Sequence, residues 1–127
     1  MLETPHVALG VAIAVAIPNP LISIPLAFAS HFVLDMTPHW NPHLNTETKK
    51  YGYLTNKTLL IIGIDLACAA ILTAFVSKGN MNILLVAFVS ILPDVVEGPY
   101  FLLGWKNELI KKWINFQKSI QSEANLF

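Results

Sequence analysis

Histidine and aspartate, which bind metals and move protons, recur inside apolar stretches of this 127-residue chain. His31 and Asp35 are four residues apart, so on a helix both side chains point to the same side. A neutral imidazole and a carboxylate placed in this way can share a divalent cation. His6, Asp65 and Asp94 lie in three other apolar segments. Because an ionised group in hydrocarbon is costly unless it is paired, wet or metal-bound, these residues are candidate functional groups.

These five side chains offer enough nitrogen and oxygen ligands for one divalent ion. A tetrahedral zinc site takes three or four ligands and keeps one position open if it is catalytic. Zinc is therefore the expected ion, with manganese and iron as alternatives. His39 follows the predicted end of the helix that carries His31 and Asp35, and it is a further candidate ligand. Glu97 and Asp94 are the candidate catalytic residues, because a carboxylate can take the proton of metal-bound water.

Each residue also has a structural interpretation. His31 and Asp35 could form a hydrogen-bonded pair that joins helices. Asp65 could make a hydrogen bond between helices, since a lone Asp within a helix needs a partner. Asp94 could mark a helix break and cap the next helix, and His6 could be an interfacial residue. Metal ligation and a structural polar network are thus the two interpretations that the sequence supports.

The segments that position these residues are predicted to be membrane helices. The chain is 54% hydrophobic and 13% charged, which leaves too little polar surface to coat a soluble domain. Residues 58–76 carry Asp65 as their only charge and come close to the roughly 20 residues that cross a bilayer. We therefore expect an all-α fold, a polytopic membrane helical bundle of about four short transmembrane helices plus a C-terminal amphipathic helix.

Residues 1–104 are predicted to form the transmembrane domain, interrupted by a polar loop over residues 37–57. The first two segments are short, so they either span a thinned bilayer or turn inside it, and we expect them to span. In residues 105–127, apolar and lysine side chains recur at a spacing typical of an amphipathic helix on an anionic membrane surface. The predicted apolar segments are residues 4–17, 21–36, 58–76 and a stretch from Met81 to a break at Pro93-Asp94, with turns at Pro18-Asn19-Pro20 and Ser77–Asn80.

The lysines predict an orientation. Net charge is zero, every basic residue is a lysine, and no basic tract indicates a nucleic-acid partner. If all four segments span, Lys78 is the only lysine on its side, and the opposite side carries the other seven. The positive-inside rule then places both termini in the cytoplasm. The five candidate ligands all lie toward this side, so we expect them to meet in the inner leaflet.

Three short motifs point to a family: Thr4-Pro5-His6, the segment from His31 to Trp40, and Leu92-Pro93-Asp94. The chain resembles the small bacterial inner-membrane proteins predicted to be metal-dependent hydrolases, which are distantly similar to zinc-dependent phospholipase C. The resemblance covers residues 4–100. The chain departs from larger relatives because it has no arginine and no HRxxxH segment. The resemblance implies metal-site positions at His6, His31, Asp35 and Asp94, with Asp65 and His39 as additions.

We therefore expect a membrane-embedded metal-dependent hydrolase that acts on phospholipid or phosphoester substrates at the inner leaflet of a bacterial inner membrane. Its expected partners are membrane lipids and further copies of the chain as a homo-oligomer. The alternative is a non-enzymatic integral membrane protein, whose polar network is structural or binds a metal or a partner without turnover. A transporter is a third hypothesis, because broken segments and intramembrane carboxylates also suit ion paths. The single Cys68 offers no disulfide and is expected to pack as a small hydrophobe.

Overall fold

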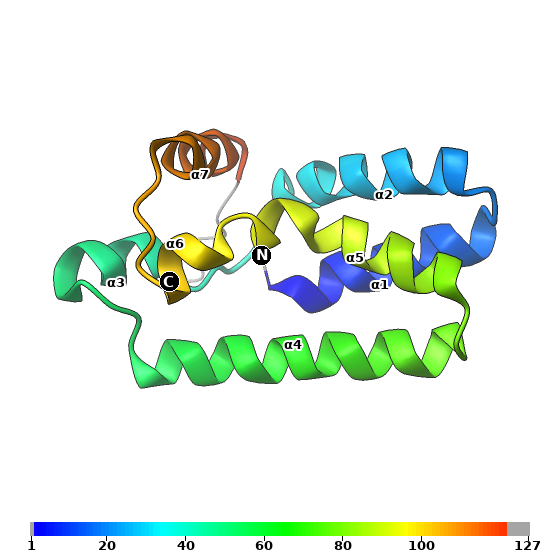
Figure 1. Cartoon of the computed structure of the whole chain (residues 1–127), viewed down its shortest axis with the longest axis horizontal. Helices are drawn as coiled ribbons and strands as arrows, with labels where there is room; N and C mark the ends of the chain where they lie inside the picture. Colours follow the sequence, from blue (N-terminus) through cyan, green and yellow to red (C-terminus); the bar gives the residue numbers. More distant parts are fainter. Residues whose placement is uncertain (1, 122–127) are drawn as a thin grey trace.

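The computed structural model describes residues 2–121, which form seven helices (Figure 1). α1, α2, α4 and α5 lie along one another, and α3, α6 and α7 gather at one end of this bundle (Figure 1). The prediction of an all-α fold is confirmed. The helices are α1 Glu3–Ala16, α2 Pro20–Asp35, α3 Leu44–Tyr51, α4 Asn56–Ser77, α5 Met81–Val95, α6 Gly98–Leu102 and α7 Glu108–Ile120.

Polar caps set the ends of the long helices. The Asn19 side chain accepts a hydrogen bond from the N–H of Leu21 at the start of α2, and Thr55 accepts one at the start of α4. Asn80 caps α5 in the same way. Lys78 and Gly79 adopt positive φ values of 47° and 83°, which reverse the chain between α4 and α5. Both predicted turns therefore form, and both lie at the end of the bundle opposite α3 and α7 (Figure 1).

The segment 37–57, predicted to be a loop, contains α3. This prediction failed because α3 is short and polar and lacks the apolar periodicity that marks a packed helix. Tertiary hydrogen bonds hold it instead. The Glu47 carboxylate accepts from Thr58 Oγ1 at 2.6 Å and from Thr55 N at 3.0 Å, and these bonds lower the pKa of Glu47. Gly52, with φ of 77°, ends the helix.

α5 continues through Pro93 and Asp94, where a break was predicted. A proline inside a helix removes one hydrogen bond and bends the helix without having to end it. Pro25 lies inside α2 in the same way. The next helix has Glu97 at its N-cap position, without a side-chain cap. The interpretation of Asp94 as the cap of a following helix is therefore wrong.

The interior of the bundle consists mainly of small side chains. A Cβ atom added at Gly10 of α1 would lie 2.7 Å from Cβ and Oγ of Ser90 in α5. Small residues allow helix backbones to approach closely, as in membrane helix pairs. The buried apolar residues of the four long helices are Val7, Val11, Ala14, Ala27, Ala69, Val86 and Ala87.

Large apolar side chains lie on the outside. Leu21 is 83% exposed and Phe75 is 79% exposed. Among the described helices, α4, with 22 residues, is the one long and apolar enough to cross a membrane, and only 11% of its apolar window is buried. α1, α2 and α5 have 14 to 16 residues, or about 21–24 Å at 1.5 Å per residue, against a hydrocarbon core of roughly 30 Å. Of the four predicted spans, α4 alone reaches spanning length.

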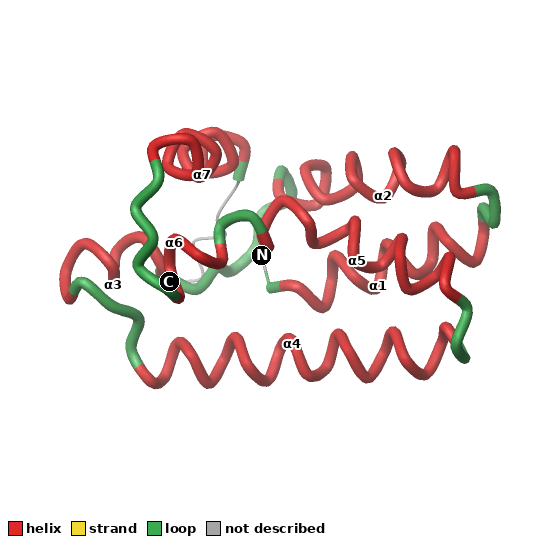
Figure 2. Tube along the Cα trace, in the orientation of Figure 1, coloured by secondary structure: helices red, strands yellow, loops and turns green. Residues whose placement is uncertain are grey.

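The predicted amphipathic helix is α7, which a loop connects to α6 (Figure 2). Ile114 and Gln117 are its buried residues. The indole N–H of Trp113 donates to the Pro93 carbonyl at 2.9 Å, and its ring lies edge-on to Phe32. α7 therefore covers the ends of α2 and α5, and the rest of the predicted C-terminal helix, residues 122–127, lies outside the described residues.

Candidate metal centre

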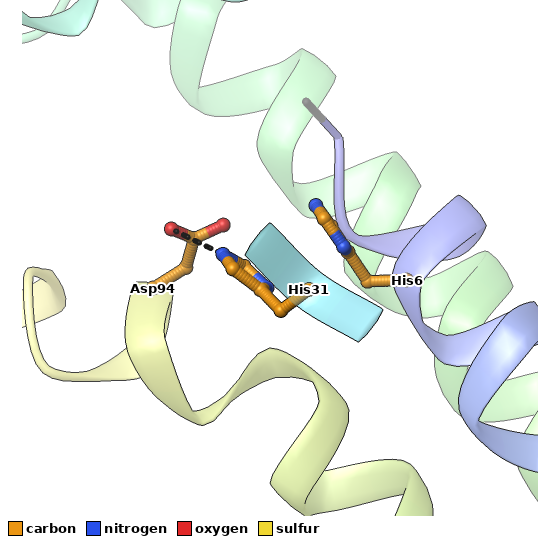
Figure 3. Close-up of side chains that lie close together, drawn as sticks. All are labelled: His6, His31 and Asp94. Atoms are coloured by element: carbon orange, nitrogen blue, oxygen red, sulfur yellow. Dashed lines mark ion pairs between the residues drawn. The ribbon is translucent and has the colours of Figure 1, made fainter. Parts of the chain in front are cut away.

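Four predicted ligands from three helices meet at the end of the bundle near α7. His6 comes from α1, His31 and Asp35 from α2, and Asp94 from α5 (Figure 3 shows the two histidines and Asp94). Both histidines are 0% exposed, and Asp35 is 1% exposed. The imidazole rings stack, with centroids 4.0 Å apart and 18° between their planes. This end of the bundle therefore encloses a cluster of polar side chains that is almost inaccessible to solvent.

The distances between nitrogen and oxygen atoms are those of ligands around an ion. His6 Nε2 lies 3.4 Å from Asp35 Oδ1, and His31 Nε2 lies 3.2 Å from Asp35 Oδ2 and 3.5 Å from Asp94 Oδ1. Charge-assisted hydrogen bonds are shorter, at roughly 2.7–2.9 Å. Two ligands of a tetrahedral zinc ion, each about 2.0–2.1 Å from it, lie roughly 3.3 Å apart. One ligand atom each from His6, His31 and Asp94 fall within 4.8 Å of one another, so this group could hold a metal ion.

The hydrogen bond of His31 fixes which of its nitrogens is available. His31 Nδ1 lies 2.9 Å from the Ser90 carbonyl oxygen, and because a carbonyl only accepts, Nδ1 carries the proton and donates it. Nε2 then faces the carboxylates of Asp35 and Asp94, which requires either a second proton or a cation between them. Hydrogen bonding of the far nitrogen is also how metal-binding histidines are oriented.

His6 makes fewer hydrogen bonds than His31. Neither of its ring nitrogens has a hydrogen-bond partner within residues 2–121, although Nε2 approaches Asp35 at 3.4 Å. Buried polar atoms in folded proteins nearly always have a partner, so such an atom indicates a site for water or an ion. A hydrogen-bonded helix pair explains His31 and Asp35, whereas it leaves Nδ1 of His6 without a partner within the described residues.

Asp65 of α4 lies outside this group, and its carboxylate faces the N-terminus of α1. Its Oδ2 accepts from Glu3 N at 2.5 Å and its Oδ1 from Thr4 N at 3.1 Å, and Thr4 Oγ1 donates to the Asp65 carbonyl at 3.0 Å. The first amides of a helix have no partner within the helix, and the helix dipole favours a negative charge there. Asp65 thus makes the hydrogen bond between helices that was its structural interpretation.

His39 and Glu97 also lie outside the group. His39 follows α2, and its Nδ1 lies 2.5 Å from the Thr37 carbonyl oxygen. Glu97 is half-buried between α5 and α6. Burial, with the nearby charge of Asp94, raises the pKa of Glu97 to about 8. Glu97 is therefore mostly protonated at neutral pH, which favours proton donation over the role of general base predicted for it.

The sequence did not reveal two further residues of the site. Gln117 of α7 is 1% exposed, and its Nε2 donates to Asp94 Oδ1 at 2.8 Å. The sequence feature that could have identified Gln117 is its position four residues after Trp113, which places a polar side chain on the apolar face of an amphipathic helix. Ser90, which lies four positions before Asp94 on the same helix face, acts through its backbone carbonyl, so its side-chain type carries no signal.

A cavity of about 380 Å³ adjoins the group through Asp94. Carboxyl groups of Glu3, Asp65, Asp94 and Glu97 line part of it. α7 contributes Lys118 to the lining. Its apolar lining, from α4, α5 and α6, includes Ile62, Leu66, Ile91, Val95, Phe101 and Leu102.

No family model, curated protein or solved structure matches this chain.

Proposed function

We propose that this chain is an integral membrane protein that binds one divalent metal ion and hydrolyses a phosphoester bond in a lipid-like substrate. One observation carries the proposal. Two stacked, buried histidines face two carboxylates at ligand-like distances, and the nitrogens of one histidine have no hydrogen-bond partner within the described chain. Zinc is the expected ion, because imidazole and carboxylate ligands in a small dry site suit it.

The distribution of apolar side chains supports the membrane location. Large apolar residues are exposed on the outer faces of the long helices, whereas the interior is built from Gly, Ala, Ser and Val. A soluble monomer rarely exposes contiguous apolar surface on this scale. α4 would span, and the shorter helices would span a thinned bilayer or cross it with their polar ends in the headgroups. The lysine bias favours an orientation with both termini in the cytoplasm, and the family resemblance is the ground for a bacterial inner membrane.

The residues around the site would have different roles in hydrolysis. A bound divalent ion lowers the pKa of a water ligand and polarises a phosphoryl oxygen. His31, fixed by the Ser90 carbonyl, His6 and Asp94 would hold it. Asp35, in contact with both imidazoles, would accept the proton of the attacking water.

The leaving oxygen needs a proton as the bond between it and phosphorus breaks. Glu97 supplies it in this proposal, because its raised pKa keeps its carboxyl protonated below about pH 8. Glu97 lines the same cavity as Asp94, so it can reach a substrate there. After the step Glu97 is a carboxylate that regains a proton from solvent, and Asp35 releases its proton to solvent.

The test is hydrolysis of chromogenic phosphomonoesters and phosphodiesters by protein purified in detergent. Activity should disappear on chelation and return with zinc or manganese. His31→Ala should abolish it, and Lys49→Ala, at an exposed residue of α3 that does not line the cavity, should leave it unchanged. Activity that ignores both the chelator and His31→Ala would rule the proposal out.

The second candidate is a membrane protein in which the polar group is structural or binds metal without turnover. Asp65 favours it, because the structure uses this carboxylate to join α4 to α1. A protein that retains metal yet hydrolyses no phosphoester of the panel would support this candidate. Loss of folding in Asp35→Asn, without any bound metal in the wild type, would point to a purely structural network.

A further inference from the structure

We propose that the cavity beside Asp94 binds the single apolar chain of a phosphate-bearing amphiphile and so holds the phosphate against the metal group. This inference rests on the proposed function and names the substrate class. The position of Asp94 carries it. This carboxylate lies 3.5 Å from His31 Nε2 and also lines the cavity, so a molecule in the cavity that touches Asp94 lies next to the histidines.

The lining of the cavity is amphipathic. α4 contributes Ile62 and Leu66, and α6 contributes Phe101 and Leu102, all of them apolar. The carboxyl groups come from the N-terminus of α1 and the C-terminal end of α5, where Glu3 and Asp94 lie. A ligand that fits both the apolar part of the lining and the part with carboxyl groups has an apolar chain and a polar head. The volume of about 380 Å³ is at the lower end of the roughly 300–1,000 Å³ typical of ligand pockets, which favours one chain over two.

The proposed metal ion and one lysine favour a phosphate head, against the carboxyl groups of Glu3 and Glu97 that also line the cavity. Asp65 is already occupied by the amides of α1. Asp94 is a ligand in the proposed metal group, so the cation offsets its charge. Lys118 of α7 is the ammonium group that lines the cavity, and it is available to a phosphate oxygen. A cationic head is the opposite expectation, which the carboxyl groups would favour in a protein that binds no metal.

The position of α4 ties the cavity to the membrane. Ile62 and Leu66 line the cavity, whereas Leu60 and Ile64 are 64% and 57% exposed on other faces of the same helix. α4 is the described helix able to cross a bilayer, so the cavity wall is part of the membrane-facing helix itself. An amphiphile could thus pass from the bilayer into the cavity without crossing water.

The experiment measures binding of octyl phosphate to the zinc-loaded full chain in amphipol by titration calorimetry, with octylammonium and inorganic phosphate as comparison probes. Ile62→Trp fills the cavity, and Leu60→Trp is its matched control on the exposed face. We expect one octyl phosphate per chain, with affinity reduced at least about tenfold by Ile62→Trp and unchanged by Leu60→Trp. Inorganic phosphate should bind more weakly than octyl phosphate and equally to both variants.

A second pair tests the head. Lys118→Gln should weaken octyl phosphate binding several-fold, and Lys112→Gln, at an exposed lysine on another face of α7 that does not line the cavity, should not. Equal affinity in Ile62→Trp and Leu60→Trp, or a preference for octylammonium, would overturn the proposal. If Ile62→Trp does not fold, Leu66→Trp gives the same comparison with Ile64→Trp.

Metal content, measured on the same samples, separates this inference from the proposed function. A protein that retains zinc but binds octyl phosphate equally in all tryptophan variants contradicts the cavity proposal alone. A protein that binds no zinc contradicts the proposed function, and selective loss of octyl phosphate in Ile62→Trp would still support the cavity as a chain-binding site.

Discussion

The interior of the bundle has two regions that are held together differently. Toward the turns, Ala14, Ala27 and Val86 form a small apolar cluster. At the other end, His6 and His31 stack among carboxylates, with contacts too long for strong hydrogen bonds. The first region is stabilised by close packing. In the second region, the contacts between the histidines and the carboxylates are too long to add much stability, so close packing in the first region must help to hold these groups in place.

The junction between the two regions is the contact of Gly10 with Ser90. α1 and α5 run in opposite directions (Figure 1), so His6 and Asp94, each four residues away, lie one turn further along in the same direction. The missing Cβ of Gly10 thereby sets how close α1 comes to α5 at the site. Packing one turn away therefore fixes the geometry of the histidines and carboxylates.

The largest effect is expected from closing that junction. Gly10→Ala places a methyl group 2.7 Å from Ser90, and we expect it to lower the free energy of unfolding by about 1–3 kcal/mol. Gly63→Ala is the matched control in α4, where nothing lies within 4 Å, and it should stabilise by up to about 1 kcal/mol through helix propensity. Thermal unfolding in detergent compares them. Stabilisation by both substitutions would show that the junction is not tight.

A smaller effect is expected from Asp65, which belongs to neither region. Asp65→Ala removes two acceptors from the first amides of α1, so stability should fall by about 1–2 kcal/mol. Metal content should stay at the wild-type level, because Asp65 is not in the metal group. Asp94→Ala is the comparison, and it should lose metal. Loss of metal in a folded Asp65→Ala would place Asp65 in the site after all.

The smallest effect is a pH dependence at the rim of the polar region. The pKa of Glu97 is raised from 4.5 to about 8, so the folded chain holds this proton more tightly than the unfolded chain. The free energy of unfolding should therefore fall as pH rises from about 4.5 to about 8. Glu97→Gln should remove this decline, measured as the unfolding temperature between pH 5 and 9. An unchanged pH profile would show that Glu97 titrates normally.

Much of the site could be predicted from the sequence because its signals are local. His31 and Asp35 share a helix face through their spacing, and His6 and Asp94 are ionisable groups in apolar segments that end on the same side. Asp65 is also an ionisable group in an apolar segment, but it lies outside the metal group and accepts hydrogen bonds from the first amides of α1. A carboxylate that caps a neighbouring helix and one that faces a histidine look alike until the helices are packed.

The fold was predictable where apolar periodicity or a strong cap marked it. α4 and both turns follow from such signals. α3 could not be predicted in this way, because the hydrogen bonds that hold it, from Thr55 and Thr58 to Glu47, are tertiary contacts. Pro93 was misleading for a related reason, since the packing of α5 against α1 and α2 keeps it helical past the proline. The role of Gln117 depends on how α7 docks, which the sequence does not encode locally.

Metal content, measured by elemental mass spectrometry on detergent-purified protein from metal-replete growth, tests whether His6, His31 and Asp94 hold an ion. We expect about one zinc, manganese or iron ion per wild-type chain, its loss in His31→Ala, and its retention in His43→Ala, with folding matched by circular dichroism. Absence of stoichiometric metal from the wild type, or its retention in His31→Ala, would contradict the account and leave a hydrogen-bonded helix network in its place.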